Sequence, residues 1–120
     1  MILRDILRVL NANHIYIDDQ TILDRDFICV SVTDLMSDAL AMVCSAGEHT
    51  FLLTGLVNAQ SIRTAEMLDI NTIIYVRDKV PQQDDLNVGI ELKMNLFTTS
   101  LSMYEASGLL YESGLKTATR

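Results

Sequence analysis

Three short apolar segments constrain the fold of this chain more than any other feature. Residues 51–55, 72–77 and 95–100 each contain an uninterrupted apolar run that ends in polar, mostly hydroxyl-bearing residues, and a helix-like segment follows each one. Such runs are typical of strands buried on both faces, which occur mainly in parallel sheets covered by helices. In open sheets of that kind, ligands bind beyond the carboxyl ends of the strands. The polar ends therefore predict a binding rim.

The remaining pattern predicts strands that alternate with helices. Strands are expected at residues 14–17, 27–32, 50–54, 72–77 and 95–98, and helices at 2–10, 58–68, 83–93 and 100–113, with one more that is capped by Thr33 or Asp34 and ended by Gly47. Asn58 and Ser100 are expected N-caps, Pro81 suits the loop before a helix, and Gly114 closes the last helix. This order indicates βαβ units and an α/β fold. The chain between the first two strands is too short for a helical crossover, so part of the sheet is expected to be antiparallel.

Length and composition exclude several classes of function. At 120 residues and 49% hydrophobic content, the chain is expected to form one globular domain over residues 1–114. A C-terminal tail is expected at 115–120, frayed because residues 116–120 lack apolar anchors. Nine basic and sixteen acidic residues give a net charge of −7, which disfavours nucleic acid and anionic membranes as partners.

The expected location is the cytoplasm. Arg4, Asp5 and Arg8 interrupt the leading apolar stretch, so no secretory signal is predicted. No apolar segment approaches the roughly 20 residues of a membrane span. Cys29 and Cys44 are interpreted as reduced core thiols.

Catalytic patterns are missing from the sequence, so we predict a protein that is not an enzyme. His14 and His49 lie on different elements without a ligand pattern, so no metal is expected. No phosphate-binding glycine loop or Gly-x-Ser-x-Gly elbow occurs, and no cofactor is expected. Asp34 and Asp38 are one helical turn apart, so they could bind a cation together or act in acid–base catalysis. The alternative is that they cap and complement a helix dipole.

The candidate ligand site lies at the carboxyl ends of the strands. Its lining is expected to be Ser31, Thr33, Asp34, Ser37, Asp38, Thr54, Gly55, Thr98, Thr99 and Ser100, with Arg63 and Arg77 as anion contacts. Two walls would be helix N-termini, whose free N–H groups accept an anion. Hydroxyl groups suit a neutral or singly charged ligand better than a triphosphate. The alternative interpretation is that these serines and threonines only cap helices.

Residues 31–114 resemble a standalone DRTGG-domain protein. The resemblance rests on residues 31–40, 52–56, 63–68, 73–81 and 96–106, of which the last segment, Leu-Phe-Thr-Thr-Ser-Leu-Ser-Met-Tyr-Glu-Ala, is the most distinctive. It implies a three-layer α/β/α fold with a central, mostly parallel sheet, similar to the N-terminal domain of HPr kinase/phosphorylase. Related domains are regulatory inserts in CBS-domain pyrophosphatases and in long phosphotransacetylases. In the pyrophosphatases the insert lies beside adenine-nucleotide-binding domains and helps to form the dimer.

The chain departs from the motif that gives this family its name. That motif has Gly-Asp-Arg after one strand and Thr-Gly-Gly after the next, whereas Thr33-Asp34-Leu35 and Thr54-Gly55-Leu56 stand here. The arginine is therefore absent, and with it the paired donors that best bind a phosphate. This departure favours a protein-interaction role over nucleotide sensing.

Two functions follow as expectations. The first is a non-enzymatic regulatory module that dimerises and binds a small anionic, adenine-nucleotide-like ligand at the strand ends. The alternative is an interaction or scaffold subunit of a redox, hydrogenase-associated or signalling complex, with no ligand. A homodimer is expected because apolar residues occur on more than one side of the helices at 2–10 and 100–113.

Overall fold

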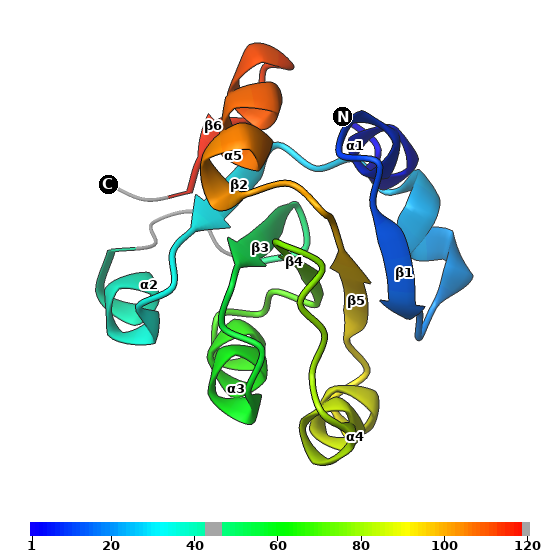
Figure 1. Ribbon diagram of the computed structural model, residues 1–120, viewed down its shortest axis with the longest axis vertical. Coiled ribbons are helices and arrows are strands. Elements are labelled where there is room, and N and C mark those ends of the chain that lie inside the picture. The colour runs from blue at the N-terminus through cyan, green and yellow to red at the C-terminus, as the bar shows by residue number, and fades with distance from the viewer. Residues whose placement is uncertain (43–46, 119–120) are drawn as a thin grey trace.

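The computed structural model describes residues 1–42 and 47–118, which form a single six-stranded sheet flanked by helices (Figure 1). In chain order the elements are α1 (Leu3–Val9), β1 (Asn13–Tyr16), the 3-10 helix η1 (Gln20–Asp24), β2 (Cys29–Val32), α2 (Met36–Met42), β3 (Thr50–Thr54), α3 (Ala59–Met67), β4 (Thr72–Tyr75), α4 (Gln83–Glu91), β5 (Asn95–Thr98), α5 (Met103–Glu112) and β6 (Lys116–Thr117).

The strand order is β1-β5-β4-β3-β2-β6. The pairs β5–β4, β4–β3, β3–β2 and β2–β6 are parallel, and β1 is antiparallel to β5. Helices α1 and α5 lie on one face of the sheet, and α2, α3 and α4 lie on the other (Figure 1). The predicted three-layer α/β/α fold with a mostly parallel sheet is therefore confirmed. Part of the sheet is antiparallel, as expected, but the antiparallel strand β1 pairs with β5 and is not next to β2.

Alternate residues of each strand supply the two halves of the core. Phe51, Leu53, Ile74 and Phe97 pack on the side of α1 and α5. Leu52, Ile73, Tyr75 and Leu96 pack on the side of α3 and α4. All residues of β3, β4 and β5 are buried, which agrees with the uninterrupted apolar runs of the sequence.

Several helix boundaries follow the predicted caps, and one does not. The Asn58 side chain caps α3, Pro81 precedes α4, and Gly114 follows the end of α5 with a φ of 98°. Ser100 is not the N-cap of α5. Ser102 holds that position, and it forms a capping box in which the Ser102 and Glu105 side chains bond each other's backbone N–H groups.

The predicted frayed tail is wrong for residues 115–118. Lys116 and Thr117 form β6 beside β2, and the amide N–H of Ala118 donates to the Val30 carbonyl at 3.0 Å. Leu115 and Ala118 are buried. Two residues of strand carry too weak a pattern to be recognised without their partner β2.

Of the two cysteines that were expected in the core, the structure describes one. Cys29 is half-buried in β2, whereas Cys44 lies outside the described residues, as does the stretch 43–46 before Gly47.

In the part of the chain that the structure describes, no helix is long and apolar enough to cross a membrane.

Candidate functional site

The segments Thr33-Asp34-Leu35 and Thr54-Gly55-Leu56, which stand where the family motif has Gly-Asp-Arg and Thr-Gly-Gly, meet at the carboxyl ends of β2 and β3. One oxygen of the Asp34 carboxylate, Oδ1, accepts the amide N–H of Gly55 at 2.6 Å and the hydroxyl of Thr54 at 3.1 Å. The Thr54 hydroxyl also accepts the amide N–H of Leu56 at 3.1 Å. Asp34 therefore connects the turn after β2 to the turn after β3, and Asp34, Thr54 and Gly55 form the centre of the site.

A lysine that the sequence reasoning missed completes this centre. The Lys79 ammonium donates to the Gly55 carbonyl at 3.2 Å. A Cβ atom at residue 55 would lie 3.3 Å from Asp34 Oδ1 and 3.4 Å from Lys79 Nζ, so both side chains approach this glycine closely and a larger residue would press on Asp34. We call Asp34, Thr54, Gly55 and Lys79 the strand-end cluster.

The loop after β4, which leads to Lys79, has an unusual backbone conformation. Arg77 and Asp78 both have positive φ, 58° and 56°, which is uncommon for residues other than glycine. The Arg77 and Asp78 N–H groups donate to the carbonyls of Leu101 and Thr99, at 2.9 and 2.8 Å. The loop is thereby fixed to the connection between β5 and α5. No sequence pattern marked these two backbone conformations, so Lys79 could not be placed in advance.

Buried hydroxyl groups lie on the sheet beside the cluster. Thr54, Tyr75 and Thr98 are paired across β3, β4 and β5, so the three side chains point to the same face, that of α3 and α4. Within the described residues, the buried hydroxyls of Ser31, Tyr75 and Thr98 have no hydrogen-bond partner. A buried hydroxyl without a partner costs about 1–3 kcal/mol, so this face holds unsatisfied hydrogen-bonding capacity.

Tyr75 shows the effect of this environment on ionisation. Burial raises the pKa of Tyr75 to about 12, the nearby Ser61 hydroxyl lowers it to a lesser extent, and the charge of Asp85 raises it. Ser61 itself donates to the Asn58 carbonyl at 2.9 Å, and the Tyr75 hydroxyl meets no partner in hydrogen-bonding geometry among the described residues. The neutral phenol is therefore strongly favoured in the folded protein.

Helix N-termini at this end of the sheet already hold acceptors from the protein. At α3, the Asn58 side chain accepts the N–H groups of Gln60 and Ser61, and the Asp85 carboxylate accepts that of Ala59 at 3.0 Å. At α5 the capping box engages the N–H groups of Glu105 and Ser102. An anion at the start of α3 would therefore compete with Asn58 and Asp85, and one at the start of α5 would compete with Ser102 for the Glu105 N–H.

The other predicted site residues are spread around the strand ends. The Thr33 hydroxyl accepts the Leu35 N–H at 3.0 Å, and Ser37 and Asp38 are exposed on α2. Thr99 is buried on the opposite face, where its hydroxyl donates to the Leu10 carbonyl at 2.7 Å. Ser100, Arg63 and Arg77 are exposed. Across residues 1–42 and 47–118, the side chains of Ser37, Asp38, Ser100, Arg63 and Arg77 form no hydrogen bond or ion pair with the strand-end cluster.

The same described residues contain no metal-binding geometry. No group of three or more histidine, cysteine, aspartate or glutamate side chains is arranged to hold a metal ion there.

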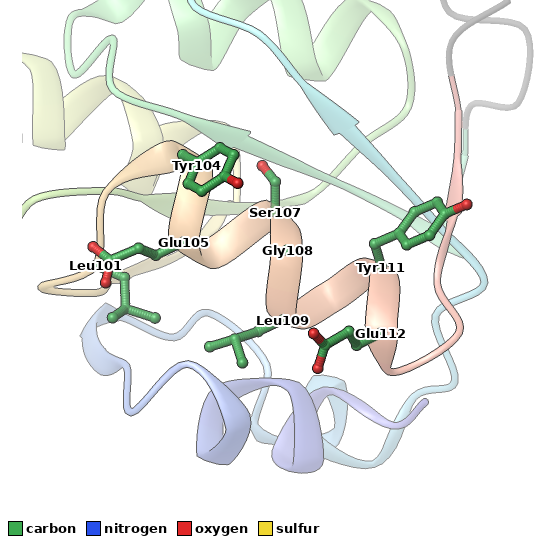
Figure 2. Close-up of a pocket in the computed structure, with 8 residues that line it drawn as sticks. All are labelled: Leu101, Tyr104, Glu105, Ser107, Gly108, Leu109, Tyr111 and Glu112. Atoms are coloured by element: carbon green, nitrogen blue, oxygen red, sulfur yellow. The ribbon is translucent and has the colours of Figure 1, made fainter.

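A second surface feature lies on α5, away from the strand ends. A hollow of about 620 Å³ lies along this helix. Its lining residues, drawn in Figure 2, are Leu101, Tyr104, Glu105, Ser107, Gly108, Leu109, Tyr111 and Glu112. The side chains of Leu101 and Leu109 point toward α1, while those of Tyr104 and Tyr111 lie on the other side of the helix. Tyr104 and Tyr111 are 88% and 84% exposed. The second apolar stripe predicted for the last helix is thus on the surface.

The α1 helix differs, because its packing covers most of its apolar side chains. Leu3, Ile6 and Leu10 are fully buried, Leu7 is half-buried, and Val9 is 37% exposed. Of the two helices on which the dimer prediction was based, α5 is the one that leaves large aromatic side chains uncovered.

Together, the sheet topology and the junction of Asp34 with Thr54 and Gly55 define an α/β domain with a DRTGG-like fold. A solved structure with this fold covers the CBS and DRTGG domains of the regulatory region of Clostridium perfringens pyrophosphatase, complexed with the activator diadenosine tetraphosphate. The match has a TM-score of 0.69 and 18% sequence identity, and it covers 92% of this chain and 46% of that one. The chain therefore spans about half the length of this structural neighbour. No protein-family model matches the sequence, and no curated protein matches it significantly.

Proposed function

We propose that this chain is a non-enzymatic regulatory module that dimerises and receives a small anionic ligand at the carboxyl ends of its strands. The strand-end cluster carries the proposal, because it combines a cation, Lys79, with backbone and hydroxyl donors of Gly55 and Thr54. The clostridial neighbour belongs to a regulatory region complexed with a nucleotide activator. That description supports a regulatory role and makes adenine nucleotides the first ligands to test.

The position of Asp34 defines how such a ligand would bind. The Asp34 carboxylate already accepts the donors that an anionic ligand would use, at 2.6 Å from the Gly55 nitrogen. An incoming anion must displace it, and the two negative charges repel each other. A singly charged group beside Lys79 is therefore favoured over a triphosphate.

Calorimetric titration with AMP, ADP, ATP and diadenosine tetraphosphate tests the ligand site. Lys79→Gln is expected to weaken binding about tenfold, which corresponds to the loss of one charge-assisted hydrogen bond. Asp34→Asn is expected to strengthen binding, since it removes the competing charge and retains an acceptor for Gly55. The control is Lys93→Gln, which makes the same chemical change at an exposed lysine before β5. If the wild-type protein shows no heat and no change in melting temperature with any of these nucleotides, a nucleotide-like ligand is excluded.

A second function is favoured by a different observation. The chain's own side chains accept the first N–H groups of α3 and the Glu105 N–H of α5, and Tyr104 and Tyr111 are exposed on α5. Both features suit an interaction or scaffold subunit that binds no ligand. This function would be supported if the nucleotide titrations gave no heat and the protein formed a stable dimer or a complex with another protein.

A further inference from the structure

A carboxylate of the chain itself occupies the centre of the strand-end cluster. Asp34 Oδ1 accepts two donors of the turn after β3, the Gly55 N–H at 2.6 Å and the Thr54 hydroxyl at 3.1 Å. Thr54 and Gly55 are buried, whereas Asp34 is exposed. The carboxylate therefore reaches from the surface to two buried donors, which is the position that an anion entering from solvent would take.

Lys79 lies beside this position without pairing with Asp34. Asp34 Oδ1 and Lys79 Nζ both face the side of Gly55 on which a Cβ atom would stand, at 3.3 and 3.4 Å from it. Among the described residues these two charged groups form no ion pair, and the exposed Lys79 ammonium donates to the Gly55 carbonyl. An oxyanion that is not attached to the backbone at residue 34 can bind the Gly55 N–H and also the ammonium, which adds a charge-assisted hydrogen bond that Asp34 lacks.

The same carboxylate fixes the start of α2. Asp34 is followed by Leu35, whose carbonyl accepts the N–H groups of Asp38 and Ala39 at 3.0 and 3.2 Å and so begins the helix. Of the α2 side chains that the structure describes, those of Met36 and Ala39 are buried and the others are exposed. The Asp34 contact is therefore a large part of what holds the start of this seven-residue helix against the sheet.

We propose that Asp34 is an internal substitute for the ligand. A carboxylate, or another singly charged oxyanion, binds at Thr54, Gly55 and Lys79 by displacing Asp34, and this displacement releases the start of α2. The inference rests on the ligand site of the proposed function, and it names the chemical class of the bound group and the element that moves. Occupancy of the strand ends is thereby converted into a change at α2, as a regulatory module requires.

Formate provides the first test, because it is a free carboxylate. Asp34→Ala removes the internal carboxylate, and sodium formate at about 200 mM is expected to raise the melting temperature of this variant by about 2–5 °C more than sodium chloride does. The wild-type protein and Asp38→Ala, at an exposed carboxylate on α2, should respond equally to the two salts. The double variant Asp34→Ala/Lys79→Gln should lose most of the response to formate.

Amide hydrogen exchange measures the release of α2. In Asp34→Ala, the amides of residues 36–42 should exchange at least about tenfold faster than in the wild type, whereas those of α4 should change much less. Formate should not restore their protection, because it fills the anion position without a covalent link to α2. Asp34→Asn retains an acceptor for Gly55, so its α2 should stay protected. In the wild-type protein, any nucleotide that gives heat in calorimetry should accelerate the exchange of α2.

The results separate this inference from the proposed function. A nucleotide that binds the wild-type protein but leaves the exchange of α2 unchanged overturns the release of α2 and retains the ligand site. Equal effects of formate and chloride on Asp34→Ala overturn the anion position. If formate stabilises that variant and its α2 exchanges faster, whereas no nucleotide binds, the inference stands and the nucleotide-like ligand of the proposed function is excluded.

Discussion

At the scale of single residues, Asp34 joins the turns after β2 and β3 through its bonds with Thr54 and Gly55. Its carboxylate is the acceptor for the amide N–H of Gly55, which is buried. Asp34→Ala is expected to lower the free energy of unfolding by about 1–3 kcal/mol, because a buried donor is left without a partner. Urea denaturation measures this loss. The matched Asp38→Ala, on the exposed side of α2, should change stability by less than about 0.5 kcal/mol. Equal losses in the two variants would show that the Gly55 contact is unimportant.

Tyr75 gives a prediction about alkaline pH. Its pKa is about 12 in the folded protein and 10.0 without burial. The unfolded state therefore loses its proton first, so stability is complete below pH 10 and falls as the pH rises from 10 to 12. The total is on the order of 2–3 kcal/mol.

The variant Tyr75→Phe isolates this effect. It should be at least as stable as the wild type at pH 7, since it removes a buried hydroxyl that has no partner among the described residues. Between pH 10 and 12, the variant should lose less stability than the wild type in guanidinium denaturation series. The same alkaline loss in both proteins would mean that other groups cause it.

At the scale of elements, the apolar runs were sufficient to locate the central strands. The predicted ranges 50–54 and 95–98 agree with β3 and β5, because strands buried on both faces need no polar alternation. The position of Lys79 depends instead on the backbone conformations of Arg77 and Asp78, and β6 depends on its register with β2. Such long-range contacts leave no periodic pattern in the sequence. Asp34, Thr54 and Gly55 lie together at the carboxyl ends of the strands, where the sequence placed them, whereas Lys79 beside them was not predicted.

The N-cap of α5 is Ser102, and its contribution to stability can be measured. Ser102→Ala is expected to destabilise the protein by about 1 kcal/mol, since it removes the acceptor of the Glu105 N–H. Ser100→Ala is the control: this exposed residue was the predicted cap, and its replacement should have almost no effect on thermal unfolding. A larger loss for Ser100→Ala than for Ser102→Ala would contradict the observed start of the helix.

At the scale of the whole molecule, charge is expected to govern association. Each copy carries a net charge of −7, so two copies repel each other at long range. An increase from about 50 to about 300 mM sodium chloride shortens the distance over which this repulsion acts. We therefore expect the dimer to become tighter by several-fold in sedimentation equilibrium. A dimer that weakens with salt would instead indicate attractive ion pairs across its interface.

The sheet also depends on the last described strand. A chain that ends at Leu115 loses β6 and the hydrogen bonds that Lys116 and Ala118 donate to Ile28 and Val30. We expect its free energy of unfolding to fall by about 2 kcal/mol or more, as judged by urea denaturation, because several backbone bonds and a buried side chain are lost together. Lys116→Ala, which keeps the backbone bonds, is the control. Unchanged stability of the shortened chain would show that β6 contributes little.

The strand order has a kinetic consequence. Both edges of the sheet are closed by strands from opposite ends of the described chain: β1 pairs with β5, and β6 pairs with β2. Each of these pairings closes a loop of roughly eighty residues, and such long loops slow the search for native contacts. The four central strands are connected in sequence and can assemble before either edge is covered. Until β6 arrives, β2 presents an open row of backbone N–H and carbonyl groups to other chains, so this interval during refolding is when aggregation competes most strongly.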